Sequence, residues 1–391
     1  IKEGAYPGCQ IVVLKDGKEM YNKAFGTHTW GGIVGISANK LPAAVSVPGA
    51  GLPVSPTDVY DLASLTKTTA TLLAVMKLYD KGRLSLTDRA SDYLPWLQDT
   101  DKKDITIRQL LLHESGLPST LLFYQEAIDE DSYTGTLFKA RPDATHSVQI
   151  GTRTWANPKF RFKKGLTSKV RTAEHTLQVS DSLWLNRSFK EEYRQKIVKA
   201  PLRDRRYRYS CVGFILLQQV VEARTGMSMD AFLEQEFYAP MGLKHTGYLP
   251  LQGAAAVGIA SGTYTPVPKA EIIPSSIDPF LRKTVLQGFV HDESAAFLGG
   301  VSGNAGLFSN ATEVARIYQM LLNGGELDGK RYLSPETCRV FTTTVSRISR
   351  RGLGFDKPDR QNPAKSPCAA AAPATVYGLS LIHISEPTRR S

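Results

Sequence analysis

The stretch Val59-Tyr60-Asp61-Leu62-Ala63-Ser64-Leu65-Thr66-Lys67 decides how this chain is interpreted. Apolar side chains recur at helical spacing over residues 68–78, and Gly82 is a typical helix stop. Residues three apart on a helix share a face, so Ser64 and Lys67 are predicted to point the same way. A serine becomes nucleophilic beside a base, and lysine can be that base if burial or nearby positive charge lowers its pKa. Unpaired N–H groups at the helix start, including that of Ser64, favour a developing oxyanion. The pattern predicts acyl transfer to Ser64.

The Ser-x-x-Lys spacing is not specific by itself. Ser37-Ala38-Asn39-Lys40 has the same spacing, but it lies in a stretch rich in Gly, Ala and Pro with no helical pattern behind it. An isolated match of this kind is best explained by chance or by a solvated lysine. The interpretation of Ser64 therefore depends on the segments that accompany it.

Four further segments accompany Tyr60 to Lys67 in a fixed order along the chain. They are Ala5 to Lys18, Leu111-Leu112-His113-Glu114-Ser115-Gly116-Leu117-Pro118, Tyr238 to Gly247, and the glycine-rich run Gly299 to Ser309. Together they resemble landmarks of the penicillin-recognising serine hydrolases, which comprise class C β-lactamases, DD-peptidases and related esterases. The resemblance covers most of residues 1–378. It implies an α/β (α+β) fold of the β-lactamase/transpeptidase type, with an antiparallel sheet flanked by helices, a mainly helical second lobe and the active site between them.

The chain divides on this pattern into a hydrolase domain over residues 1–378 and a tail over 379–391. The sheet lobe is expected over about 1–60 and 212–378, and the helical lobe over about 64–211. The residues themselves predict a hairpin with strands 10–14 and 19–25, turned at Asp16-Gly17, after which 31–56 reads as a loop. Helices are predicted over much of 64–118 and over 214–225, 229–237 and 312–323. The polar insertion 119–206 has no place in the family pattern.

A second family element is a Tyr-x-Asn loop whose tyrosine faces the nucleophile. Tyr209-Ser210-Cys211 fits it, because it follows the insertion and directly precedes a helix, whereas Tyr207 lacks that setting. By resemblance, Tyr209 relays the serine's proton, which a phenol beside an ammonium can do. Cys211 stands where the family has Asn or Asp and is a candidate substrate contact. A thiol cannot donate and accept as an amide does, which disfavours β-lactam turnover more than ester or peptide cleavage.

A third family element is a Lys/His-Thr-Gly strand near the C-terminus. Lys244-His245-Thr246-Gly247 has the right letters but lies upstream of the glycine-rich run, so it is rejected. The element is due after Gly378, where the chain instead reads Leu379-Ser380-Leu381-Ile382-His383-Ile384-Ser385-Glu386. Residues 379–391 resemble translated sequencing-adapter sequence, so the hydrolase is expected to be C-terminally truncated at Gly378. An unpaired sheet edge and a lost oxyanion donor would then make the chain poorly soluble and nearly inactive.

Composition excludes several other classes of protein. With 391 residues, 42% hydrophobic and 22% charged, the chain resembles an ordinary globular protein, and no apolar run is long enough to span a membrane. The net charge of +11 comes without any nucleic-acid-binding motif, so no nucleic-acid partner is expected. Gly324 to Lys330 only approximates a phosphate loop. The four cysteines show neither disulfide nor metal-site spacing, and we expect no metal and no cofactor.

The residues and the resemblance together predict a serine hydrolase that works through an acyl-enzyme. The expected substrates are peptidoglycan-like peptides, small esters or β-lactams, and the resemblance implies an exported, periplasmic or cell-envelope location. The chain begins at Ile1 without a visible leader, so either a leader has been removed or a longer protein has been cut. Its opening also resembles the hydrolase half of fusions that carry an N-terminal β-N-acetylhexosaminidase. The alternative is a domain that binds muropeptides or β-lactams without turning them over, which Cys211 favours.

Overall fold

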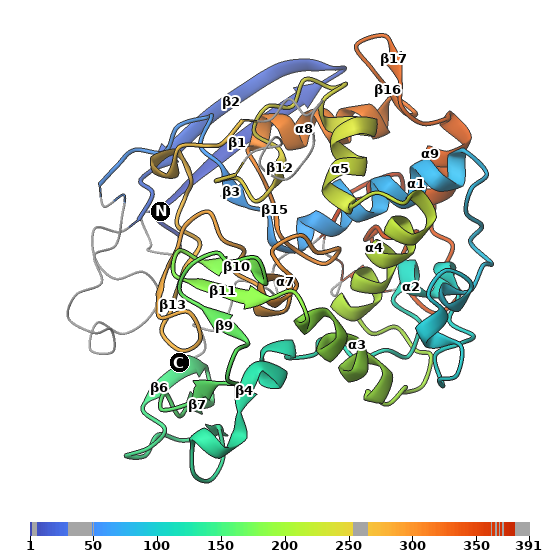
Figure 1. Ribbon diagram of the computed structural model, residues 1–391. Helices are drawn as coiled ribbons and strands as arrows, with labels where there is room; N and C mark the ends of the chain where they lie inside the picture. The colour runs from blue at the N-terminus through green and yellow to red at the C-terminus, as the bar shows by residue number, and fades with distance from the viewer. Residues whose placement is uncertain are drawn as a thin grey trace.

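The structure is a computed structural model that describes residues 1, 6–29, 49, 51–252, 265–360, 362–363, 366, 368–369 and 371–379. Its helices are α1 (Leu72–Asp80), α2 (Ile107–Leu112), α3 (Phe189–Lys199), α4 (Cys211–Thr225), α5 (Met229–Leu233), α7 (Glu293–Phe297), α8 (Ala311–Leu322) and α9 (Pro335–Thr342). Helix α1 lies in the middle of the molecule with α4 and α5 beside it, and one large apolar core surrounds it (Figure 1).

The predicted hairpin is confirmed and forms one outer edge of the molecule. Strands β1 (Gly8–Lys15) and β2 (Lys18–Gly26) pair antiparallel around Asp16-Gly17, and both turn residues have positive φ. Helix α8 packs against β1, and the Gln10 side chain accepts a hydrogen bond from the backbone N–H of Ala311 at 2.9 Å. The helix predicted over 312–323 is thus confirmed, and it anchors the hairpin.

A short three-stranded sheet leads into the nucleophile segment. Strand β15 (Leu307–Ser309) lies between β12 (Gly247–Tyr248) and β3 (Tyr60–Asp61), and both pairings are antiparallel. The short hairpins β13 (Ser276–Asp278) with β14 (Thr284–Leu286) and β16 (Glu326–Leu327) with β17 (Lys330–Arg331) are antiparallel too. The sheet therefore places the end of β3 against the glycine-rich run that precedes α8.

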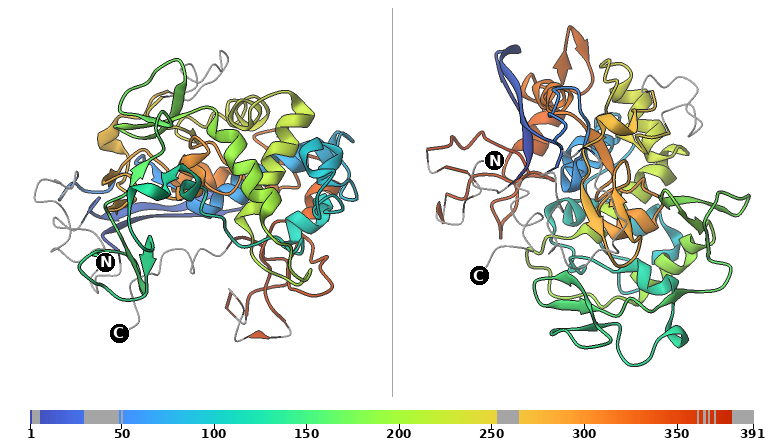
Figure 2. Two further views of the ribbon diagram at one scale, coloured as in Figure 1. Left: turned by 60° about the horizontal axis from the view of Figure 1, so that its bottom comes forward. Right: turned by 90° about the vertical axis from the view of Figure 1, so that its left-hand side faces the viewer.

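The insertion differs from the helical lobe expected over residues 64–211. Between its helical parts it carries strands β4 (Ile128–Asp129), β5 (Phe138–Lys139), β6 (Val148–Gly151), β7 (Thr154–Ala156), β8 (Arg161–Phe162), β9 (Thr167–Ser168), β10 (His175–Ser180) and β11 (Leu183–Asn186). These form small antiparallel sheets on the side of the molecule opposite the β1–β2 hairpin (Figures 1 and 2). Alternating, β-branched and aromatic side chains in β10 and β11 favour strands over a helix.

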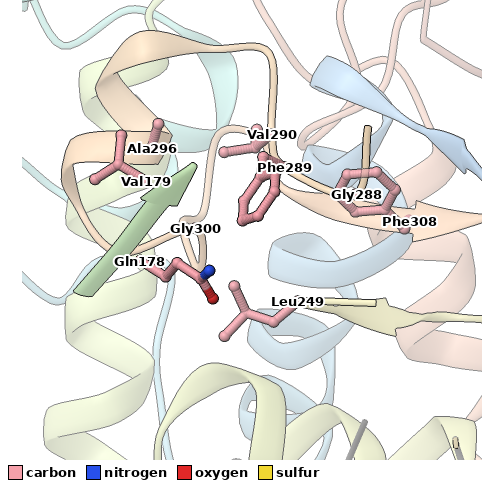
Figure 3. Close-up of a pocket in the computed structure, with 9 residues that line it drawn as sticks. All are labelled: Gln178, Val179, Leu249, Gly288, Phe289, Val290, Ala296, Gly300 and Phe308. Carbon is pink, nitrogen blue, oxygen red and sulfur yellow. The ribbon is translucent and has the colours of Figure 1, made fainter. Parts of the chain in front are cut away.

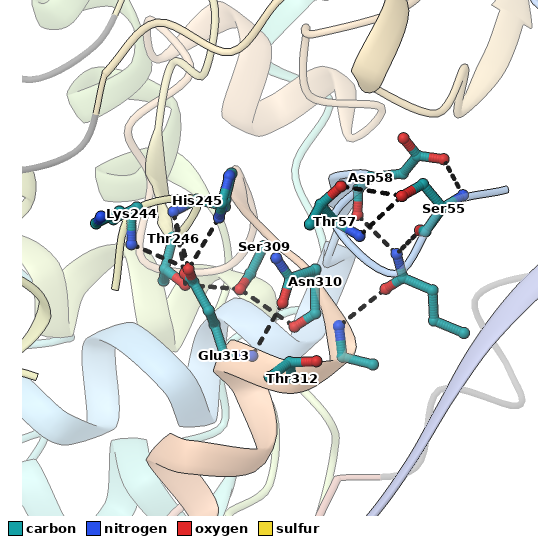
Figure 4. Close-up of polar contacts among 12 residues, drawn as sticks. Ser55, Thr57, Asp58, Lys244, His245, Thr246, Ser309, Asn310, Thr312 and Glu313 are labelled. Atoms are coloured by element: carbon teal, nitrogen blue, oxygen red, sulfur yellow. Dashed lines mark hydrogen bonds and ion pairs between the residues drawn. The ribbon is translucent and has the colours of Figure 1, made fainter. Parts of the chain in front are cut away.

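One buried carboxylate holds the loop before β12 to the start of α8 (Figure 4). Glu313 accepts hydrogen bonds from the backbone N–H groups of Lys244 and His245, at 3.0 and 3.1 Å, and from the Thr246 hydroxyl at 2.6 Å. The Asn310 side chain caps the same helix by accepting from the Glu313 backbone N–H. Lys244 to Gly247 therefore has a structural role, in agreement with its rejection as the third family element.

The last described residues contact the segment at Phe355 and Asp356. Asp356 and Gly378 exchange backbone hydrogen bonds of 2.7 and 3.1 Å, and the Tyr377 ring packs on Phe355. The expectations about residues 380–391 and about most of the 31–56 loop, including Ser37, lie outside the described residues. Among the described residues, no helix is both long and apolar enough to cross a membrane.

Candidate active site

Ser64 is held at a sharp turn between β3 and the helix that follows. Asp61, at the end of β3, accepts a hydrogen bond from the Ala63 backbone N–H at 2.8 Å. Ala63 has φ of +46°, a left-handed conformation that is uncommon for residues other than glycine. Ser64 then lies in a single 3₁₀ turn over Ala63–Leu65, and a π-helical turn over Lys67–Thr71 follows before α1 begins. Strained backbone of this kind is typical of functional sites.

The predicted pairing of Ser64 and Lys67 is present. Lys67 is fully buried, and its Nζ donates to Ser64 Oγ at 2.9 Å and to the Asn304 carbonyl oxygen at 2.9 Å. A third neighbour is Cys211 Sγ at 3.5 Å. The amine therefore has an acceptor on each of three sides, one of which is the candidate nucleophile.

The charge environment of Lys67 differs from the expectation. Burial lowers the pKa of its ammonium, but Cys211, Tyr209 and Asp292, which can carry negative charge, together outweigh burial and raise it. The condition stated for a lysine base, a lowered pKa, is therefore not met in the resting protein. With its pKa raised, Lys67 is an ammonium at neutral pH, and an ammonium has no lone pair with which to accept a proton.

Tyr209 reaches the site, as its sequence setting predicts. Lys67 Nζ lies 4.9 Å from the centroid of the Tyr209 ring, and the tyrosine packs on the His113 ring at 4.6 Å. Its hydroxyl is buried, and among the described residues no group forms a well-directed hydrogen bond with it. Tyr207 instead lies under the Arg351 guanidinium, 5.8 Å from its ring centroid. Of the two tyrosines, Tyr209 is therefore the one next to the amine.

His113 supports this tyrosine from behind. Burial, helped by the charges of Arg351 and Lys67, lowers its pKa well below the usual range, so the ring is neutral. Its Nδ1 accepts a hydrogen bond from the Ser210 backbone N–H at 3.1 Å, and the ring also packs on Phe214. These contacts give the histidine of the Leu-Leu-His-Glu-Ser-Gly-Leu-Pro segment a structural role.

Cys211 begins α4 and faces Lys67. Burial raises the pKa of its thiol, and Asp292 acts in the same direction, whereas Lys67 and the Asn304 side chain act against them. A thiol is a weak hydrogen-bond donor and acceptor. Beside it lies the Asn304 amide, which is 1% exposed and comes from the glycine-rich run. The structure thus places Asn304 beside Cys211, the residue that stands where the family has Asn or Asp.

Three acids near the site were not singled out from the sequence. Asp292 accepts a hydrogen bond from Asn304 Nδ2 at 3.2 Å. Burial and the charge of Asp292 raise the pKa of both Asp61 and Glu293. The convergence comes from tertiary structure, because Asp61 precedes the nucleophile by three residues while Asp292 caps α7. No local pattern in the sequence joins these two positions.

A small cavity lies beside α7 but is separate from this chemistry (Figure 3). Apolar side chains line it, except for the Gln178 amide, and neither Ser64 nor Lys67 is among its lining residues. Within the described ranges, no group of three His, Cys, Asp or Glu side chains is placed to hold a metal ion. The described chemistry therefore centres on Ser64, Lys67 and their neighbours.

Comparison with known proteins agrees with this fold. The beta-lactamase family matches residues 1–363, so the chain belongs to that family of serine hydrolases. It is 29% identical over 360 residues to a putative D-alanyl-D-alanine carboxypeptidase of Escherichia coli (strain K12), covering 90% of this chain and 68% of that protein. It is also 29% identical over 369 residues to an N-acetylmuramyl-L-alanine amidase of Bacillus subtilis (strain 168), covering 92% of this chain and 68% of that one.

Solved structures show the same architecture at lower sequence identity. A penicillin-binding protein homologue from Caulobacter crescentus matches with a TM-score of 0.56 and 17% identity, covering 97% of this chain and 82% of that one. An octameric penicillin-binding protein homologue from Pyrococcus abyssi matches with a TM-score of 0.54 and 19% identity, covering 90% and 61%. The β-lactamase/transpeptidase-like fold predicted from the sequence is confirmed.

Proposed function

We propose that this chain hydrolyses amide or ester bonds through an acyl-enzyme on Ser64. The observation that carries the proposal is the buried contact of 2.9 Å between Lys67 Nζ and Ser64 Oγ. Lys67, once deprotonated, takes the hydroxyl proton as Ser64 attacks the carbonyl carbon. Tyr209 passes a proton to the leaving group, and water then releases the acyl group. The Ser64 backbone N–H, at the start of the helix, stabilises the oxyanion.

The substrate we propose is a peptidoglycan-like peptide. The relatives named as carboxypeptidase and amidase support amide chemistry on such material. A groove along α3 is lined by Pro118 and Leu121, whose carbonyl groups bond to serines next to Tyr209 and close to Asp292 in the chain, and we propose that it holds the far part of a ligand longer than a small ester. The Pro118 carbonyl accepts from the Ser210 hydroxyl at 2.7 Å, and the Leu121 carbonyl accepts from Ser294 at 2.7 Å. Such a substrate fits an exported, cell-envelope enzyme, and a glycosidase partner in a longer parent stays a prediction.

Binding without turnover is the second candidate function. The raised pKa of Lys67 favours it, because an ammonium cannot accept the serine proton. The thiol at Cys211 favours it too, because it replaces an amide that would orient the substrate. β-Lactams are the substrates most affected by these two features, so we rank them below peptides and esters.

Ester hydrolysis with matched tyrosine variants tests the proposal. Tyr209→Phe is expected to slow hydrolysis of p-nitrophenyl acetate by about 10²- to 10⁴-fold, the usual contribution of a proton-transfer group. Tyr207→Phe, which removes a hydroxyl from the neighbouring tyrosine, is expected to retain the parent rate. Equal rates for the two variants would remove Tyr209 from the mechanism. Undetectable turnover with intact binding of a D-alanyl-D-alanine peptide would favour the second candidate.

A further inference from the structure

A continuous set of contacts joins Asp292 to the candidate base. Asp292 Oδ1 accepts from the Ala295 backbone N–H at 2.7 Å, which fixes the carboxylate at the start of α7. The same oxygen accepts from Asn304 Nδ2 at 3.2 Å. The Asn304 side chain is held from its other end by the Ser302 hydroxyl, which donates to Oδ1 at 2.7 Å. Asn304 then contacts Lys67 through its own carbonyl oxygen.

We infer that Asp292 is a positioning residue for Lys67, acting through Asn304 to hold the amine against Ser64. The inference rests on the proposed function of Ser64 and Lys67 and adds a residue to it. Asp292 does not touch the reacting atoms in this arrangement. It fixes the asparagine whose carbonyl takes one hydrogen of the lysine amine.

The position of the Asn304 carbonyl determines which way the Lys67 amine points. A neutral amine has two N–H donors and one lone pair, and the lone pair must face Ser64 Oγ to accept its proton. Asn304 O and Cys211 Sγ occupy the other two sides, at 2.9 and 3.5 Å. Sulfur is the weaker acceptor, so the Asn304 carbonyl is the main anchor. A shift of this carbonyl turns the lone pair away from the serine.

The charge of Asp292 also acts on Lys67, together with several other groups. Cys211 and Tyr209 face the amine from the start of α4, and His113 lies behind Tyr209. Asp61 and Glu293 flank Asp292 itself. Within this set, Asp292 raises the pKa of the Lys67 ammonium. Removal of its charge therefore lowers that pKa and makes the free amine available at lower pH.

Two substitutions separate the position of Asp292 from its charge. Asp292→Asn keeps an oxygen that can accept from Ala295 and Asn304 but removes the charge. Asp292→Ala removes both. Asp80→Asn is a matched control, because the Asp80 carboxylate also accepts hydrogen bonds at a helix start, from the Ser334 N–H and the Thr337 hydroxyl of α9. The readout is the rate of labelling by a fluorescent fluorophosphonate as a function of pH.

We expect Asp292→Asn to shift the midpoint of the rising limb to lower pH while it keeps most of the plateau rate. Asp292→Ala should lower the plateau by about 10- to 100-fold, the scale of misplacing a catalytic group. Asp80→Asn should match the parent in both respects. If circular dichroism shows that Asp292→Ala does not fold, the pH midpoint of labelling in Asp292→Asn still tests the inference.

An unshifted midpoint in Asp292→Asn would overturn the inference, as would a parent-like plateau in a folded Asp292→Ala. Labelling of Ser64→Ala serves to keep the two proposals apart. If Ser64→Ala still reacts at the parent rate, the proposed function fails. If it does not react and the Asp292 variants behave like the parent, only the role of Asp292 fails.

Discussion

Replacement of Glu313 by alanine should remove the main polar link between α8 and the loop at residues 244–246. Four groups lose their partner: the Lys244 N–H, the His245 N–H, the His245 ring at Nδ1 and the Thr246 hydroxyl. A buried donor left without a partner costs about 1–3 kcal/mol. Thr246 is fully buried but can turn to Ser309 Oγ at 2.6 Å, and Lys244 lies at the surface where water can replace the carboxylate. We therefore expect Glu313→Ala to lower the free energy of unfolding by about 2–4 kcal/mol.

Urea unfolding followed by far-UV circular dichroism measures this change. The midpoint should fall while the slope m stays constant, because a lost contact alters stability and not the surface exposed on unfolding. Glu336→Ala is the matched control, since that glutamate pairs with Arg339 at the surface and its side chain is 64% exposed. The control should leave the urea midpoint close to that of the parent. Equal midpoints for the two variants would refute the structural role assigned to Glu313.

Three further predictions concern stability and substrate choice. The contact between Glu313 and His245 lowers the pKa of the glutamate and raises the pKa of the histidine. The pair should therefore stabilise the fold most between pH values of about 4.5 and 6.5, the ordinary pKa values of the two groups. This stabilisation should decline as pH falls through the lowered pKa of Glu313, and also as pH rises through the raised pKa of His245. Urea midpoints that do not change with pH over both ranges would contradict this prediction. Gly303→Ala should destabilise the protein by at least about 2 kcal/mol in thermal unfolding, because the new Cβ would lie 2.1 Å from the Phe214 carbonyl oxygen. Gly151→Ala is the control: its Cβ meets no atom closer than 3.5 Å, so its stability should be close to that of the parent. Cys211→Asn should increase nitrocefin hydrolysis relative to ester hydrolysis, since an amide can orient the lactam, and no increase over Cys211→Ser would show that the thiol is not limiting.

The parts of this fold that the sequence predicted are those with strong local patterns. The β1–β2 hairpin has alternating strands and an Asp-Gly turn, and α8 has clear helical periodicity, whereas α4 is buried on every face over residues 212–221 and shows a long apolar run instead. The strands of the insertion are mostly two to four residues long and lie in small separate sheets, which leaves too few residues for alternation to identify. The family landmarks on either side of the insertion, in contrast, were enough to identify the segments that form the site.

The site itself was predictable where spacing decides and unpredictable where tertiary contacts decide. Three-residue spacing on a helix brought Ser64 and Lys67 together as expected. The pKa of Lys67 moved in the opposite direction, because Cys211, Tyr209 and Asp292 come from distant segments and outweigh burial. The Asn304 carbonyl contacts Lys67 although the two residues are 237 positions apart, so no local sequence pattern predicts the contact.

If Ser64 is the nucleophile, a fluorophosphonate should form a covalent adduct on this residue. Intact-protein mass spectrometry of the parent should show one added phosphonyl group, and peptide mapping should place it on Ser64. Ser64→Ala should show no adduct, whereas Ser37→Ala, which removes the serine of the other Ser-x-x-Lys sequence, should react like the parent. An adduct on any other residue, or an undiminished adduct in Ser64→Ala, would contradict the account.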